Sequence, residues 1–311
     1  MSRRLNQTSE FDVLGDILET LRFRGSIFFR SELAAPWGMS LTETKTPYFH
    51  IVLSGECFIG AGHGDAIQTH EGDIVMLPNG GSHWIADKPG RELISSESAG
   101  EACALGNPLF QHGKITNSLI CGMVHFDRGA THPILDALPE LMHFPMNEPD
   151  GTIWALVKLI DNEMANSTGS SSQIADRLTE VLFLQLLNNY IQNSSEAGGF
   201  LMALRDRRVH RALTLIHQEP EFDWSLDSLG ERVGMSRATL VRRFQSVVGE
   251  SPMAYIKNWR IMKAYNLVKH SSSSLEQIAL SVGFASARTL AKAFEREYSV
   301  TPSELRRGQK N

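Results

Sequence analysis

Several features are scarce or missing in this chain of 311 residues. Its three cysteines, Cys57, Cys103 and Cys121, have the spacing of neither a disulfide framework nor a cysteine-based metal site. No apolar run approaches the roughly 18 residues that a membrane-spanning helix requires. The first residues, 1–7, lack the apolar core of a secretory signal. We therefore expect a cytoplasmic globular protein with no membrane partner.

An excess of positive charge is also missing from the chain as a whole, whose formal net charge is −5. The charge is unevenly distributed, however. Residues 204–311 contain 18 Lys and Arg against 11 Asp and Glu, whereas residues 1–203 contain 12 against 24. A basic C-terminal third on an acidic body is typical of a DNA-binding module attached to a second domain. The overall acidity consequently does not exclude DNA as a partner.

Short runs of β-branched and aromatic residues alternate with turn residues between about residues 20 and 130. The number of these runs favours a β-sandwich or a small β-barrel. The expected strands include residues 26–29, 48–53, 73–77 and 118–124.

From residue 151 the hydrophobic period becomes that of helices. Ile153, Leu156, Val157 and Ile160 predict one helix, and the apolar residues between 178 and 187 predict a second. The apolar faces of these helices either pack on the β-domain or form a dimer interface. The polar residues 193–199 are the best candidate for a linker.

The last third of the chain repeats one pattern. Residues 226–236 and 275–286 each predict a short amphipathic helix, a tight turn and the start of another helix. Gly234 and Gly283 stand where each first helix ends, because Gly adopts the left-handed conformation of that position without a steric penalty. Two helix-turn-helix units in tandem predict two DNA-contacting helices on one chain.

One face of each second helix is predicted to enter a major groove of DNA. Arg242 and Gln245 suit base contacts, since Arg pairs with guanine and Gln with adenine. Arg237, Arg243 and Arg296 lie beside these faces and are better placed for phosphate. The full set of predicted DNA-binding residues is Arg237, Ala238, Thr239, Val241, Arg242, Arg243, Gln245, Ala287, Arg288, Ala291, Lys292 and Arg296.

A connecting helix is expected between the two units. Ser251 is a good N-cap, and Pro252 is tolerated at the first helical position. The helix should run to Lys269 or His270, a length of roughly 27 Å. Such a rod could hold the two recognition helices about one DNA turn, roughly 34 Å, apart.

The C-terminal third resembles the AraC/XylS family of bacterial transcription regulators. The likeness lies in residues 278–286, Phe294 and residues 301–306. The resemblance implies that the module binds promoter DNA through its two helices, with RNA polymerase as a further partner. Glu295 replaces a usual Lys on the second helix, which implies that this helix binds DNA weakly or chiefly through phosphates. Other departures from the family pattern are Leu290, Tyr298, Ser299 and Leu305.

Residues 72–83 match the second cupin signature, a pattern of Gly, Pro, Gly and His at fixed spacing. Of the first cupin signature only His50 and a displaced Glu56 are present. His50 lies in an expected strand and could face His83 across the β-domain. Two imidazoles and a carboxylate would suit Zn or Fe. Alternatively, the two histidines bind an organic ligand, or they are structural.

The N-terminal part also resembles the cupin domain that precedes the DNA-binding module in one AraC subfamily. This resemblance implies an effector sensor or a dimerisation platform, and some members have cysteines that report oxidants. A redox role for Cys121 would need an accessible thiol of low pKa, whereas a buried Cys is ordinarily a small apolar residue. The likeness lies in residues 24–30, 36–38, 49–56, 72–73, 77–78, His83 and residues 121–122.

The predicted fold is α+β with two domains: an N-terminal cupin-like β-barrel with flanking helices and a C-terminal all-α double helix-turn-helix. Residues 1–150 would sense an effector, residues 151–203 would form connecting or dimerising helices and a linker, and residues 204–311 would bind DNA.

The predicted function is a sequence-specific transcription regulator, not an enzyme, that senses a small effector or an oxidant. The predicted pocket residues are His50, Glu56, His83 and Cys121, with His50 and His83 as ligands of a divalent metal if one is bound. The first alternative is a metal-dependent cupin enzyme with an accessory DNA-binding domain. The second is a DNA-bridging protein with little sequence preference.

Overall fold

The computed structural model describes residues 11–44, 46–61, 65–105, 109–127, 132–146, 151–166, 171–193 and 198–307, without the side chains of Cys103 and Ser171. The chain forms two compact units. The sheet unit contains Phe23–Phe126 and Leu138–Tyr190, and the helical unit contains Met1–Arg22, Asp127–Ala137 and Ile191–Asn311. These units alternate along the chain, whereas the expected segments 1–150, 151–203 and 204–311 follow one another.

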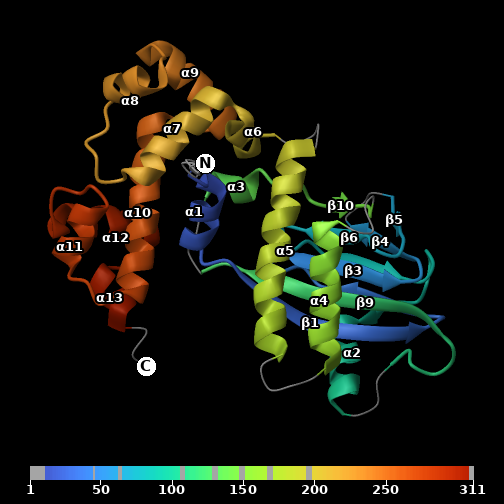
Figure 1. Cartoon of the computed structure of the whole chain (residues 1–311). Coiled ribbons are helices and arrows are strands. Elements are labelled where there is room, and N and C mark those ends of the chain that lie inside the picture. Colours follow the sequence, from blue (N-terminus) through green and yellow to red (C-terminus); the bar gives the residue numbers. More distant parts are fainter. Residues whose placement is uncertain are drawn as a thin grey trace, which may run out of the picture. The chain divides into compact units, whose positions relative to one another are not determined.

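The sheet unit contains two five-stranded sheets (Figure 1). The first sheet consists, in spatial order, of β1 (Arg24–Ala34), β9 (Ile115–His125), β3 (Tyr48–Ser54), β6 (Ile74–Leu77) and β10 (Met142–Phe144). The second consists of β5 (Ile67–Thr69), β4 (Cys57–Ala61), β7 (His83–Ala86), β2 (Gly38–Leu41) and β8 (Ile94–Ser95). Neighbouring strands are antiparallel except β2 and β8.

The four expected strands are confirmed, but the closed barrel is not. Among the described residues no ladder joins the two sheets, and three of their four edge strands, β5, β8 and β10, have only two or three residues. Such short edges leave little backbone for pairing across the gap. The fold is therefore a pair of sheets, which corresponds to the sandwich alternative.

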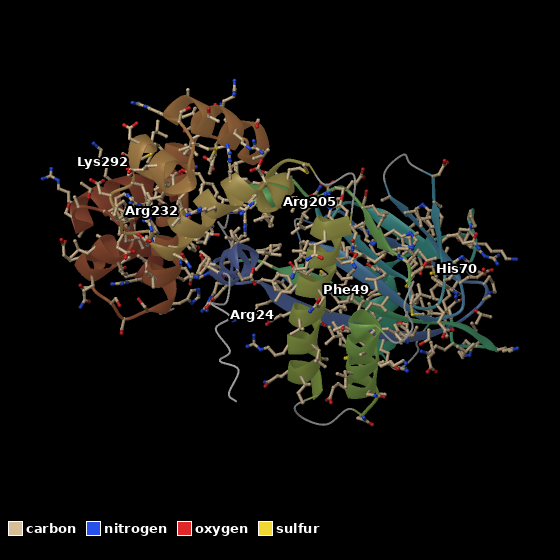
Figure 2. All side chains as sticks on the ribbon, turned by 45° about the horizontal axis from the view of Figure 1, so that its top comes forward. Arg24, Phe49, His70, Arg205, Arg232 and Lys292 are labelled. Carbon is tan, nitrogen blue, oxygen red and sulfur yellow. The ribbon has the colours of Figure 1, made fainter. Side chains whose placement is uncertain are left out.

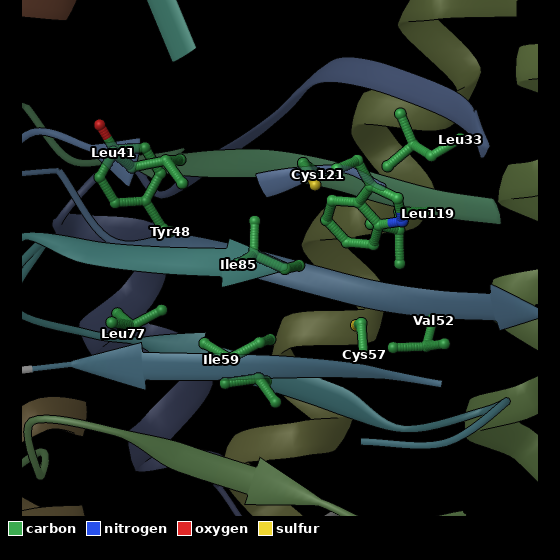
Figure 3. Packing of buried hydrophobic residues seen from close by; sticks show 12 residues of the cluster. Leu33, Leu41, Tyr48, Val52, Cys57, Ile59, Leu77, Ile85, Leu119 and Cys121 are labelled. Carbon is green, nitrogen blue, oxygen red and sulfur yellow. The ribbon is translucent and has the colours of Figure 1, made fainter. Parts of the chain in front are cut away.

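The core of the sheet unit lies between the two sheets (Figure 3). Side chains of the first sheet, such as Val52 and Leu119, meet Ile59 and Ile85 of the second, and all four are fully buried. Residues of β3 from Tyr48 to Val52 are buried on both faces, so helices must cover the outer face of this sheet.

The covering helices are α4 (Thr152–Asn166) and α5 (Ser171–Asn193), which confirms the two helices expected from residue 151 onwards. Arg30 of β1 bonds Asp161 of α4 at 2.7 Å, and the Phe23 and Phe183 rings stack with centroids 4.4 Å apart. These contacts confirm that the helices pack on the β-domain. A further helix, α2 (Ser96–Ala104), follows β8.

The helical unit contains the double helix-turn-helix and two helices from earlier in the chain (Figure 1). Most of the expected linker at 193–199 lies outside the described residues. The helices are α1 (Val13–Thr20), α3 (Pro133–Asp136), α6 (Phe200–Arg205), α7 (Arg207–Gln218), α8 (Leu226–Val233), α9 (Arg237–Val248), α10 (Pro252–His270), α11 (Leu275–Ser281), α12 (Ala287–Tyr298) and α13 (Pro302–Arg307).

Local capping explains where the helices of the two helix-turn-helix units begin and end. The hydroxyls of Ser236 and Ser251 accept hydrogen bonds from backbone N–H groups in the first turns of α9 and α10. Gly234 ends α8 with φ 67° and ψ 40°, the left-handed conformation that was expected. Phe244 is fully buried in the first helix-turn-helix unit, and Phe294 is fully buried in the second. Both helix-turn-helix units and the connecting helix are thus confirmed.

Candidate functional site

The predicted DNA-contacting face of α9 is open to solvent. Arg237, Arg242 and Gln245 are exposed, while Leu240 and Phe244 on the opposite side are fully buried. The buried apolar side fixes the position of the helix, and its polar side chains therefore face the solvent. Ala238 is exposed, and Thr239 and Val241 are half-buried at the edge of the same face.

The corresponding face of α12 has the same pattern with a different charge. Arg288, Lys292 and Arg296 are exposed, and Ala287 and Ala291 are half-buried between them. Figure 2 shows Lys292 at the outer surface of the helical unit. Glu295 is also exposed on this helix, so a carboxylate lies among the positive charges.

Arg243 is partly engaged within the protein. Its Nε donates to Asp206 Oδ2 at 2.6 Å, and Asp206 Oδ1 caps α7 by accepting from the backbone N–H groups of Arg208 and Val209. Among the described residues no partner is seen for the two terminal nitrogens of Arg243. Asp206 therefore orients a guanidinium whose outer edge is free for a phosphate.

The two helix-turn-helix units are joined by Arg260 of α10 as well as by the helix itself. Its guanidinium donates to the carbonyl oxygens of Pro220 (2.7 Å) and Phe222 (2.6 Å) before α8, and to that of Gly283 (3.1 Å) in the second turn. Gly283 has a φ of 83°, and a Cβ there would lie 2.6 Å from the Pro220 oxygen. The second turn thus requires Gly for its conformation and for its close approach to the first unit.

In the sheet unit, His50 and His83 face each other across the two sheets. Their Nε2 atoms are 2.8 Å apart, and the Nδ1 of His50 lies 3.0 Å from the Cys121 sulfur on the neighbouring strand. His83 Nδ1 lies 3.0 Å from the carbonyl oxygen of Gly81, so it must donate its proton there. The sequence-predicted His50, His83 and Cys121 are therefore brought together in one buried cluster.

The hydrogen bonds of this cluster run in one direction when both imidazoles are neutral. His83 then uses Nε2 as an acceptor for His50 Nε2–H, and His50 Nδ1 accepts from the Cys121 thiol. Burial lowers the pKa of both histidines, for His50 with a further contribution from His83. Burial, with a smaller contribution from Cys57, raises the pKa of the Cys121 thiol. The cluster is an uncharged polar site in an apolar core.

Glu56 lies outside this cluster, which corrects its predicted place in the pocket. Its side chain is 62% exposed, and it accepts a hydrogen bond from Gln68 at 3.1 Å. Glu56 follows the turn at Gly55 that ends β3, and it therefore points away from the strand faces that carry the histidines.

The cluster does not fit a divalent metal. Two nitrogens bound to one tetrahedral Zn²⁺ would be about 3.3 Å apart, whereas the two Nε2 atoms are 2.8 Å apart and hydrogen-bonded. The carboxylate ligand is missing because Glu56 is exposed. In the part of the chain that the structure describes, no three His, Cys, Asp or Glu side chains are grouped to hold a metal ion.

Comparison with known proteins gives two family matches. Residues 12–192 match a family described as Cupin, and residues 229–308 match a family described as Helix-turn-helix domain. An uncharacterized HTH-type transcriptional regulator of Haemophilus influenzae is 31% identical over 303 residues, which are 95% of this chain and 98% of the relative. The chain belongs to the AraC-type transcriptional regulators with a cupin domain.

Two other relatives are similar to this AraC-type regulator over nearly its whole length. The transcriptional regulator AlkR of Acinetobacter baylyi is 28% identical over 306 residues, 95% of this chain and 99% of AlkR. A putative AraC-like transcription regulator of Streptomyces lividans is 28% identical over 307 residues, 95% of this chain and 98% of the relative. The expected two-domain regulator is confirmed, and the enzyme alternative is not favoured. Among the described residues, no helix has the length and hydropathy needed to cross a membrane.

Sequence reasoning missed a group of polar residues in the helical unit, namely the buried His132, His217 and Tyr255 and the half-buried Asp16. They lie in four different helices or turns, and their bonds connect residues up to 201 positions apart in the chain. No local spacing marks such a set. The only signal in the sequence was that polar side chains occur at positions whose helical neighbours are apolar.

Proposed function

We propose that this AraC-type regulator binds promoter DNA with α9 and α12 and that an organic effector acting on the sheet unit changes this binding. The observation that carries the DNA contact is the exposed, basic face of each recognition helix. RNA polymerase is a further partner if the regulator activates transcription. Promoter DNA as the proposed target supports a cytoplasmic location, which is part of this proposal.

In this proposal α9 reads most of the sequence. Arg242 and Gln245 contact bases, because both are exposed and carry the hydrogen-bonding groups that distinguish guanine and adenine. Arg237 and the free edge of Arg243 contact phosphates. Arg288, Lys292 and Arg296 contact phosphates and give α12 an anchoring role, while the exposed Glu295 beside them weakens its binding to DNA.

The test compares Arg242→Ala with Arg243→Ala on duplexes that carry single base changes in the bound site. Loss of Arg242 should cost about 1–3 kcal/mol and relax the preference at one base pair. Loss of Arg243 should weaken binding to all duplexes alike and reduce the salt dependence of the affinity. Lys88→Ala, at an exposed bend of the sheet unit outside the helices, removes one positive charge and serves as the matched control. Equal losses of Arg242→Ala on all duplexes would contradict its role in base recognition.

We propose that the effector binds next to His50, His83 and Cys121. The three side chains offer hydrogen bonds in an apolar core, which is typical of sites for small organic molecules. A ligand with one donor and one acceptor could replace the direct bond between the histidines. The oxidant alternative is less well supported, because the Cys121 thiol is only 5% exposed and its pKa is raised by burial.

The effector proposal is tested with His50→Ala and His83→Ala. Compounds that change the DNA affinity of the native chain should lose this effect in both variants, while DNA affinity without compound stays the same. An unchanged response in both variants would exclude the interior between the sheets as the sensor.

A homodimer is also proposed, with α4 and α5 as the contact surface. Leu159, Ile174 and Val181 of these helices are 51%, 43% and 44% exposed, although the opposite faces of both helices pack on the sheet. Exposed apolar side chains on neighbouring helices are typical of protein–protein contacts.

A further inference from the structure

Two segments from the N-terminal half of the chain lie in the helical unit. They are residues 12–22, which contain α1, and residues 127–137, which contain α3. The apolar side of α1 is buried, and α1 contacts both α7 and α10. The Asp127 N–H donates to the Leu21 carbonyl oxygen at 3.0 Å, so the two segments are also bonded to each other.

A series of hydrogen bonds, buried except at its half-buried Asp16 end, connects these segments through α7 and α10. His132 Nδ1 accepts from the Ile134 N–H, so its proton is on Nε2, which lies 3.1 Å from the Tyr255 hydroxyl. The Tyr255 hydroxyl lies 2.8 Å from His217 Nε2 and donates to it. His217 Nδ1 then donates to Asp16 at 2.7 Å. Every donor in this series of hydrogen bonds has one acceptor. The series connects α3, α10, α7 and α1.

The charge states agree with this arrangement. Burial lowers the pKa of His132, with a smaller contribution from His217. Burial also lowers the pKa of His217 against the opposing effect of Asp16. For Asp16, burial would raise the pKa, but the bond from His217 and the charge of Lys263 outweigh it. Two neutral imidazoles and an ionised carboxylate are the states that the hydrogen bonds require.

The same segments hold α10 along most of its length. Tyr255 binds near its start, and three donors further along reach the N-terminal segments: Lys263 to Asp16 (3.1 Å), Asn266 to the carbonyl oxygen of Thr20 (3.2 Å) and Lys269 to Asp127 (2.9 Å). These positions recur at helical spacing and lie on one side of α10. The setting of α10 against α7 therefore depends on residues from outside the C-terminal third.

We propose that Asp16, His132, His217 and Tyr255 are positioning residues for DNA binding. They set the direction of α10 relative to α7, and α10 carries α12 at a fixed distance from α9. Residues 12–22 continue along the chain into β1, and residues 127–137 follow β9, the strand that contains Cys121. A shift of the paired strands β1 and β9 can thus move the segments that are covalently joined to them, and it can thereby alter the separation of the recognition helices.

The proposal rests on DNA binding by both recognition helices, and its test separates the two claims. Full-length protein is first used to select its preferred two-part site from random duplexes. Affinity is then measured for that duplex and for duplexes in which one half-site is moved by one base pair either way. Each such move shifts a half-site by about 3.4 Å along the DNA axis. Failure of the native chain to select any site would refute the proposed function. Equal affinity of the native chain for all three spacings would refute the positioning proposal alone.

The decisive variant is Tyr255→Phe, which removes only the hydroxyl and keeps the ring between Phe244 and Phe200. We expect the native chain to bind the shifted duplexes about tenfold more weakly than the selected one, and this ratio to fall toward one in the variant. A merely structural hydroxyl would instead weaken all three duplexes by the same factor, which would overturn the proposal.

Two further variants support the reading of that result. His132→Asn breaks the bond to Tyr255 and leaves the bond of Lys269 to Asp127 in place, and it should relax the spacing preference in the same way even if Tyr255→Phe folds poorly. Arg232→Gln breaks the half-buried ion pair with Glu219 in the same unit and should leave the spacing preference unchanged. A change in Arg232→Gln equal to that in His132→Asn would also overturn the proposal.

Discussion

Mild acid is predicted to destabilise the sheet unit through His50 and His83. Both imidazoles are neutral in the folded chain, because burial lowers their pKa values. In the unfolded chain their pKa is about 6.5. Between pH 6.5 and 5.5 the unfolded chain therefore takes up protons that the folded chain does not. Each histidine lowers the free energy of unfolding by up to about 1 kcal/mol over this interval, and the pair lowers it by up to about 2 kcal/mol. Well above pH 6.5 this contribution no longer changes with pH.

The measurement is urea unfolding at pH 7.5, 6.5 and 5.5, followed by tryptophan fluorescence, for the native chain and for His83→Asn. The variant keeps an acceptor for His50 but cannot take up a proton, so its stability should fall less steeply with pH, by up to about 1 kcal/mol. His70→Gln, at a side chain that is 63% exposed, should leave the pH dependence of the native chain unchanged. An identical pH dependence in His83→Asn and the native chain would show that the buried pair is not neutral and would refute the reasoning.

Two other predictions concern the same sheets. Gly122→Ala should destabilise the sheet unit by about 1–3 kcal/mol or more in thermal or urea unfolding, because the added Cβ would overlap the Phe49 ring and lie 2.6 Å from the Ser26 oxygen; a neutral effect would contradict the packing around β9. The thiol of Cys121, buried and of raised pKa, should resist alkylation in the folded protein and react only after unfolding; rapid labelling in native buffer, followed by mass spectrometry, would restore the oxidant alternative.

The sequence predicted the helical unit best where the signals are local. Ser236, Gly234 and Ser251 could be recognised as helix caps, because capping involves residues at most a few positions apart. The start of α10 at Pro252 and its end at His270 follow from such signals. That the side chains of His50 and His83 point toward each other was also predictable. This prediction requires only the alternation of side chains along a strand and the assumption that two sheets share a core.

The remaining features depend on contacts between distant residues. The capping of α7 by Asp206, which also binds Arg243, joins two helices in a way that helical spacing cannot reveal. Glu56 was placed in the pocket as the displaced glutamate of the first cupin signature, but the turn at Gly55 carries it to the surface. Strand frequency left a sandwich and a barrel open, and the choice of a barrel followed from the cupin resemblance; neither determines how the edges of two sheets pair.

The assignment of α1 and α3 to the helical unit was missed for the same reason. Periodicity identifies an amphipathic helix but not the surface on which it packs. The partner of Asp16 is His217, and the two residues are 201 positions apart. Only the folded chain brings them together.

The most direct test of the central claim is the DNA sequence that the full-length protein selects from random duplexes. Two recognition helices connected by α10 predict a site with two conserved parts, centred about one helical turn, or about 10 to 10.5 base pairs, apart. One part should be more strongly conserved than the other and should lose its preference at one base pair in Arg242→Ala. A site with one short conserved element, or selected duplexes with no common sequence, would contradict the account.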